Sequence, residues 1–294
     1  MSWAASILLL FDRADFGDSG PLAIFKSKLL LVVAGIFVLL YILGPVIVWL
    51  TQKQAANPQL MDYSSALNQP SFRMLASFCS IMQSAGFEFA GVFGLVGQTS
   101  NVNAYMACVV HRRNKETGTA IFVHAPTAPA HSKLVLEFST RFADQSSITT
   151  SNSRTPSVLS RADNKPVYKF PAVQDPLRLY HLHQQLVARD KPGFAKDIAP
   201  QGGEAARIVE GMQEDYRVQL QTGMLKLDYA NKFYRPTLLG AFCMTWKLLP
   251  PFKQLAEESL ENAAGKLLRS LENPGILYTV SGAVEGVQPR TIGR

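Results

Sequence analysis

An uncharged, apolar run over residues 29–50 constrains this chain more than any other feature of its sequence. The run reads LLLVVAGIFVLLYILGPVIVWL and is bounded by Lys28 and Lys53. At 1.5 Å of rise per residue, a helix over these residues is long enough to cross the roughly 30 Å hydrocarbon core of a bilayer. We therefore predict one transmembrane helix over residues 27–50, kinked at Gly44-Pro45.

The charges beside this run predict its orientation. Arg13, Lys26 and Lys28 precede it, whereas only Lys53 follows within reach. The positive-inside rule then places the N-terminus in the cytoplasm and the rest of the chain on the opposite side of the membrane. The odd number of cysteines and the basic character of the remaining chain favour the reverse orientation, which stays open.

The net charge of +7 belongs to the part of the chain after the run. The charged residues before Leu29 cancel one another: Asp12, Arg13, Asp15, Asp18, Lys26 and Lys28. A basic domain tethered to a bilayer is attracted to anionic lipid headgroups. Because the basic residues are scattered and form no nucleic-acid-binding motif, we expect no nucleic-acid partner.

Composition and periodicity predict one folded domain of the α+β class after the membrane helix. Apolar residues make up 47% of the chain and charged residues 17%, which argues against disorder. We expect an N-terminal tail (1–26), a polar linker (51–69), the soluble domain (70–235), a C-terminal helical segment (236–272) and a flexible tail (273–294).

Alternating and glycine-punctuated apolar segments predict an antiparallel meander of about five or six strands in this domain. The clearest strands are 87–97, 102–111, 119–124 and 133–142, and a turn over 114–118 predicts a hairpin. Shorter strands are expected at 147–150, 167–170 and 225–229. Helical spacing predicts flanking helices near 72–85, 175–189, 204–222 and 252–271, the second of them capped by Asp175-Pro176.

A second apolar stretch, residues 236–249, contains Trp246 and Lys247 and is flanked by Arg235 and Lys253. A buried core helix, a helix lying in the headgroup region and a second membrane span are all compatible with this pattern. We expect the membrane-contacting residues of the chain to be Trp49, Arg235, Trp246, Lys247 and Lys253.

No catalytic or metal-binding motif is present. His181 and His183 diverge on a helix, and Cys108 and His111 point to opposite faces of a strand, so neither pair can act together. We therefore expect no metal, no cofactor and no catalytic residue that can be named from sequence. Glu137 and Arg141 share one strand face with Ser139, which indicates either an exposed polar ladder or part of a site assembled in three dimensions.

A polar segment over 144–161 is the first place to look for a ligand. It is rich in Ser, Thr and Asn, and it carries two cations suited to an anion or a lipid headgroup. The candidate ligand-binding residues are Ser151, Asn152, Arg154 and Arg161.

These patterns predict a single-pass membrane protein whose basic domain binds lipid or a membrane protein partner without catalysis. Two alternatives stay open. One is an enzyme of the cell envelope with a site formed only in three dimensions, and the other is a structural subunit of a membrane complex.

Overall fold

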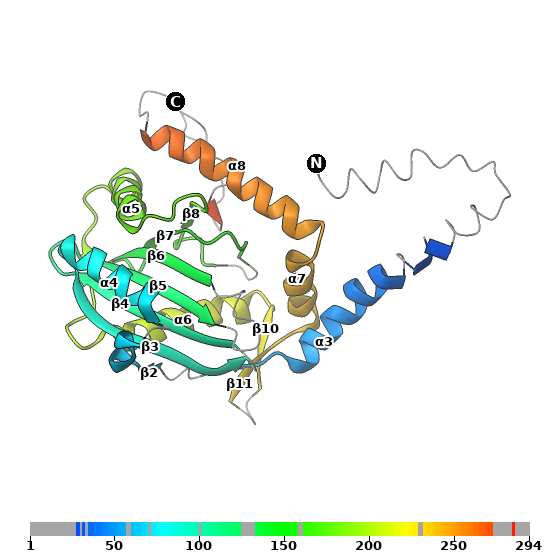
Figure 1. The fold of residues 1–294 in the computed structure, drawn as a ribbon. Coiled ribbons are helices and arrows are strands. Elements are labelled where there is room, and N and C mark those ends of the chain that lie inside the picture. Colours follow the sequence, from blue (N-terminus) through cyan, green and yellow to red (C-terminus); the bar gives the residue numbers. More distant parts are fainter. Residues whose placement is uncertain are drawn as a thin grey trace.

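The computed structural model of this chain describes residues 28–29, 31–32, 35–56, 60–69, 72–99, 102–124, 133–157, 161–228, 232–272 and 284–285. These residues form a mixed α+β fold in which one large sheet carries helices on both faces (Figure 1). The predicted tails at 1–26 and 273–294 lie outside the described residues, except for 284–285.

The large sheet has the strand order β12-β8-β7-β6-β5-β4-β3-β2. Neighbours from β2 to β7 pair antiparallel, which confirms the predicted meander, whereas β7 and β8 pair in parallel. The strands are β2 (Leu60–Asp62), β3 (Glu88–Thr99), β4 (Val102–His111), β5 (Glu116–His124), β6 (Lys133–Phe142), β7 (Ser147–Ser151), β8 (Val167–Lys169) and β12 (Val284–Glu285), and β9 (Lys196–Asp197) pairs with β6.

Alternation along the strands gives the sheet two different faces. On β6, Leu136, Phe138 and Phe142 are buried in the main core, while Glu137 and Ser139 point to the other face. Helices α4 (Arg73–Ser84) and α5 (Pro176–Asp190) cover the apolar face, and α8 (Phe252–Glu272) adds Ala263, Ala264 and Leu267 to the same core. Helix α6 (Glu204–Gln221) lies on the opposite face (Figure 1).

The predicted helix start at Asp175 is confirmed. Its carboxylate accepts a hydrogen bond from the backbone N–H of Leu177 at 2.8 Å, and Pro176 occupies the first helical turn, where its missing N–H costs nothing. Such a cap satisfies donors that have no partner inside the helix.

The described residues of the predicted linker, 51–56 and 60–69, contain short paired elements. Strand β1 (Gln54–Ala55) pairs with β11 (Phe233–Pro236), which pairs with β10 (Leu225–Asp228), while β2 extends the edge of the large sheet. A 3₁₀ helix, Ser64–Asn68, follows β2. These elements are too short to show periodicity, and their hydrogen-bond partners lie far along the chain, so local sequence could not reveal them.

The apolar run is helical from residue 35 to residue 51. An α-helical turn leads into a π-helical segment, Leu39–Leu43, and then into α3 (Gly44–Thr51). Pro45 has no N–H to donate to the carbonyl of Tyr41 four residues earlier, and that carbonyl accepts the indole N–H of Trp246 at 3.0 Å instead. Within the described residues, no helix combines the length and the apolar character needed to cross a bilayer.

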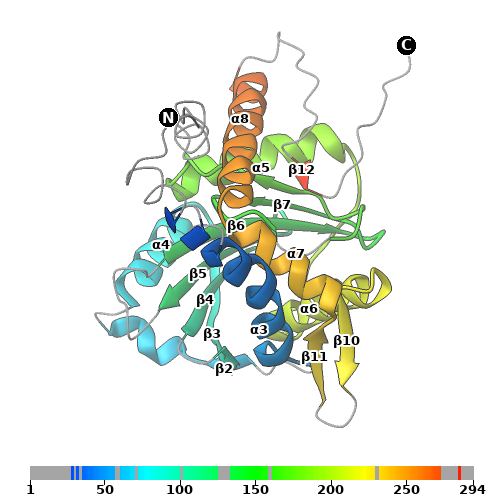
Figure 2. The same cartoon turned by 90° about the vertical axis from the view of Figure 1, so that its right-hand side faces the viewer.

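Helix α7 (Leu238–Leu248) packs against α3, and Figure 2 shows the two helices side by side in front of the strands. Its small residues Gly240 and Ala241 are buried, whereas Leu238, Leu239 and Leu248 are exposed. The stretch 236–249 is therefore covered by protein on one side only.

Candidate functional sites

The first candidate site is an apolar helical surface formed by the N-terminal helix, α7 and the start of α8. Each of its aliphatic or Phe side chains is at least 43% exposed: Ile36, Phe37, Val38, Leu39, Leu40, Ile42, Leu43, Ile47, Leu50, Leu238, Leu239, Leu248, Phe252 and Leu255. Since residues 36–40 are consecutive and span more than one helical turn, apolar side chains face solvent all around the helix there. Soluble monomers rarely expose so large an apolar patch.

The residues predicted to contact a membrane lie on or beside this surface. The Trp246 ring stacks with Phe252, and Trp49 lies 5.9 Å from the ammonium of Lys226. The basic members have protein partners. Arg235 pairs with Asp228 at 3.1 Å, Lys253 lies 3.9 Å from Glu257, and Lys247 donates to the backbone carbonyl of Ser157 at 3.3 Å.

The second candidate site is a polar cleft of about 270 Å³ between the sheet and α6. Its floor is the polar face of β5, β6 and β7, because residues paired across these antiparallel strands share one face. Five hydroxyl side chains line the floor: Thr117, Thr119, Ser139, Ser147 and Thr149. Helix α6 contributes Glu214 and Asp215 to the opposite wall, and Arg161 and Lys165 precede β8.

Ion pairs neutralise part of this cleft. Glu214 accepts from Arg141 at 2.9 Å and also from Lys165, and Arg207 pairs with Asp197 at 3.0 Å. Burial pushes the pKa of Glu214 upward, but the hydrogen bonds and positive charges of Lys165 and Arg141 outweigh it and hold that pKa below its usual value. These contacts also fasten α6 to the sheet.

Three charged side chains in the cleft have no such partner. Within the part of the chain that the structure describes, the side chains of Glu137, Asp215 and Arg161 make no hydrogen bond and no ion pair. Burial raises the pKa of Glu137, the charge of Asp215 adds to that rise, and Arg161 and Lys169 oppose it. Burial likewise raises the pKa of Asp215 against the opposing charges of Arg161 and Lys165.

Of the four predicted ligand-binding residues, Arg161 alone lines the cleft. Asn152 is buried and accepts from the backbone N–H of Leu136 at 2.8 Å, and the hydroxyl of Ser151 accepts from the backbone N–H of Ser153 at 3.1 Å. Arg154 forms an ion pair with Glu261 of α8 at 3.1 Å. The structure therefore does not bring the four residues together.

His183 and Cys108 belong to the scaffold. His183 is fully buried on the core side of the sheet, where its ring nitrogens lie 2.8 Å and 3.0 Å from the hydroxyls of Thr140 and Thr150. Cys108 is buried on the cleft side of β4, and burial raises the pKa of its thiol to about 12, which leaves it unreactive at neutral pH. The described residues contain no cluster of three or more metal-ligating side chains.

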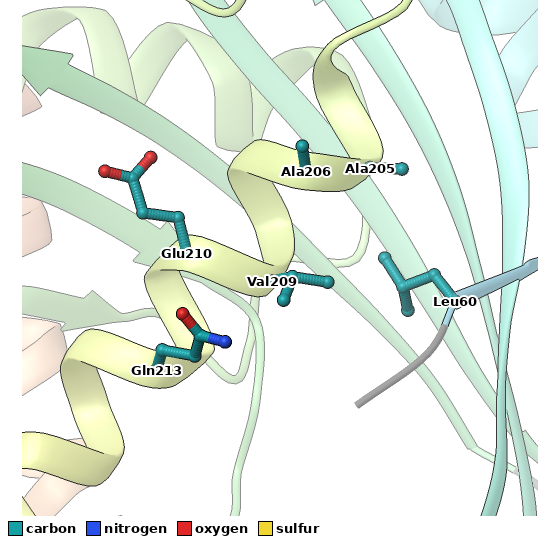
Figure 3. A pocket seen from close by; sticks show the side chains of 6 residues that line it. All are labelled: Leu60, Ala205, Ala206, Val209, Glu210 and Gln213. Carbon is teal, nitrogen blue, oxygen red and sulfur yellow. The ribbon is translucent and has the colours of Figure 1, made fainter. Parts of the chain in front are cut away.

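A third hollow, of about 450 Å³, lies between β2 and the start of α6 (Figure 3). Val209 points across it toward Leu60, whereas Glu210 points away (Figure 3). Glu210 is already paired with Arg207 at 3.0 Å. Among the described residues, no set of charged groups converges in this hollow, so it is the weaker candidate for a site.

Comparison with protein-family models, with curated proteins and with solved structures finds no match to this chain. The two candidate sites therefore rest on the geometry of this molecule.

Asp215 is the cleft residue that sequence reasoning missed. Asp215 lies on a helix whose apolar stripe predicts only which side of the helix is buried. The sequence around it does not indicate which strand that helix packs against. The available signal for a polar site was the alternation of Glu137, Ser139 and Arg141 along a strand whose other face is apolar.

Proposed function

We propose that this protein is anchored in a lipid bilayer by its apolar helical surface and presents its α+β domain at the membrane for binding rather than catalysis. The observation that carries the proposal is the exposure of the consecutive apolar side chains of residues 36–40, which lie around the whole circumference of the helix before the buried Tyr41. A protein partner that docks through one groove covers one side of a helix, whereas lipid covers every side.

The sequence beyond the described helix supports the same conclusion. The uncharged run covers residues 29–50, so the helical part from 35 to 51 is only a portion of the apolar segment. Trp49 and the nearby Lys53 and Lys226 form an aromatic and basic boundary at its C-terminal end, as is typical of the membrane–water interface. The charge bias before the run favours a cytoplasmic N-terminus.

Flotation of the full chain with zwitterionic vesicles tests this proposal. We expect the chain to float with the vesicles at high salt, because the apolar helix and not charge holds it there. A variant carrying Ile36→Asp, Phe37→Asp and Leu39→Asp should remain at the bottom of the gradient, since each acidic residue costs about 3 kcal/mol within the membrane.

A matched control shows whether the loss of flotation comes from the apolar helical surface or from any loss of exposed apolar side chains. Met74, Leu177 and Phe194 are 42–51% exposed on the domain, away from the apolar helical surface. A variant with Asp at these three positions should float as the natural chain does. If the natural chain stayed at the bottom, or if both variants floated, bilayer anchoring through this surface would be wrong.

A further inference from the structure

We propose that the polar cleft between α6 and the sheet binds a small, neutral, polyhydroxylated ligand such as a single sugar ring. The groups that would hold it are Glu137 on the floor, Asp215 on the helix and Arg161 beside β8. The proposal rests on observations separate from those for membrane anchoring, because the cleft and the apolar helical surface share no residue.

The unpaired groups of the cleft suit hydroxyl groups. A sugar hydroxyl donates one hydrogen bond and accepts others, so it needs acceptors and donors close together. The carboxyl oxygens of Glu137 and Asp215 accept, the guanidinium of Arg161 donates, and the five floor hydroxyls do both. These three charged side chains are half-buried, and a ligand hydroxyl can form hydrogen bonds with them that no described protein group forms.

The charges of the cleft exclude other classes of ligand. An anion would meet the carboxyl groups of Glu137 and Asp215, neither of which is neutralised by an ion pair. A cation would meet the guanidinium of Arg161, which no ion pair neutralises within the described residues. An apolar ligand would bury the hydroxyl-lined floor without hydrogen bonds. A neutral ligand that forms many hydrogen bonds avoids all three penalties.

The size and rigidity of the cleft agree with a small ligand. Its volume of about 270 Å³ lies near the lower limit for small-molecule sites, which corresponds to one ring rather than a chain. The floor is a continuous antiparallel ladder, and the Arg141–Glu214 pair holds α6 at a set distance above it. Such preorganisation lowers the entropy cost of binding.

Saturation-transfer NMR of the full chain tests the proposal, in a polyoxyethylene detergent that carries no sugar. The probes are glucose, galactose, mannose, N-acetylglucosamine and inositol, each at millimolar concentration, with methyl phosphate and spermidine as charged probes. We expect saturable transfer to at least one neutral probe and none to the charged probes. Transfer to the charged probes alone, or to no probe, would overturn the proposal.

Two matched pairs of variants show whether a bound probe occupies the cleft. Gly211 on α6 lines the cleft and Gly265 on α8 does not, and an added Cβ would meet no atom within 4 Å at either glycine. Gly211→Leu should weaken binding at least tenfold, and Gly265→Leu should leave it unchanged. Likewise Arg161→Gln should weaken binding at least tenfold, while Arg154→Gln, which removes an exposed ion pair, should not.

A second arm distinguishes a free sugar from a glycolipid headgroup. The chain is reconstituted in vesicles with and without a glycolipid that carries the sugar found to bind, and competition by the free sugar is measured. If the free sugar and the glycolipid compete, and Gly211→Leu abolishes the competition, the glycolipid headgroup is the natural source of the ligand. If they do not compete, the free sugar is the ligand. Binding that is insensitive to both Gly211→Leu and Arg161→Gln would place the probe elsewhere and refute the cleft as the site.

Discussion

The buried imidazole of His183 makes the stability of this protein fall as pH falls below the pKa of an unfolded histidine. Burial lowers the pKa of His183 to about 3 in the folded chain, whereas an unfolded histidine titrates near about 6.5. Above pH 6.5 the ring is neutral in both states and has no effect on the pH dependence. Below it the unfolded state binds a proton that the folded state refuses, so stability falls as pH falls.

The size of this effect follows from proton linkage. Each pH unit between the two pKa values costs about 1.4 kcal/mol of unfolding free energy, so the loss between pH 7.5 and pH 5 is about 2 kcal/mol. Burial raises the folded-state pKa of Glu137 and Asp215, so these carboxyl groups act in the opposite direction, but they are present in the natural chain and in His183→Gln alike, and the comparison of the two isolates the histidine. His183→Gln keeps a neutral polar side chain that can bond Thr140 and Thr150, and it removes the titration.

Urea unfolding of the full chain in detergent, followed by tryptophan fluorescence at pH 7.5 and pH 5, measures the difference. His183→Gln lowers stability at both pH values through imperfect packing, but its loss between them should be about 2 kcal/mol smaller than that of the natural chain. His181 lies on the exposed side of the same helix, so His181→Gln should lose as much stability between the two pH values as the natural chain does. Equal losses in the natural chain and His183→Gln would refute the assignment of a neutral, proton-excluding site.

Three further substitutions test other parts of the structure by the same unfolding measurement. Asp175→Ala should cost about 1 kcal/mol by removing the cap of α5, while Asp175→Asn should cost little; equal costs would contradict the capping role. Lys196→Met should cost about 3 kcal/mol, because it leaves the 2% exposed carboxylate of Glu116 with only the hydroxyl of Tyr180 as a partner. Adding Glu116→Gln should recover part of that loss, and no recovery would refute the explanation. Gly240→Ala should cost at least about 2 kcal/mol, because its Cβ would lie 2.0 Å from the backbone oxygen of Met224. Gly265→Ala, where the added Cβ meets no atom within 4 Å, should stabilise α8 by up to about 1 kcal/mol. Similar effects of the two substitutions would contradict the packing of α7.

Local sequence was sufficient where one element carried its own signal. The meander strands and the capped α5 followed from periodicity and turn residues, because alternation and helical spacing report directly which side of an element is covered. The irregular helix before Pro45 was predicted only in part from the sequence. The proline predicted a kink, but the donor that satisfies the freed carbonyl, Trp246, is 205 residues away.

The sequence by itself determined the α+β class, the order of the main elements and the uncharged apolar run, since each depends on residues that are neighbours along the chain. Only the tertiary structure decided that β1 and β2 pair with strands far along the chain, that β8 pairs in parallel with β7, and that α6 covers the polar face of the sheet. It also separated Arg161 from Arg154 and placed Glu137 opposite Asp215. These outcomes depend on which distant surfaces meet, and the free energy of that choice comes from burial and pairing between segments, which no single segment contains.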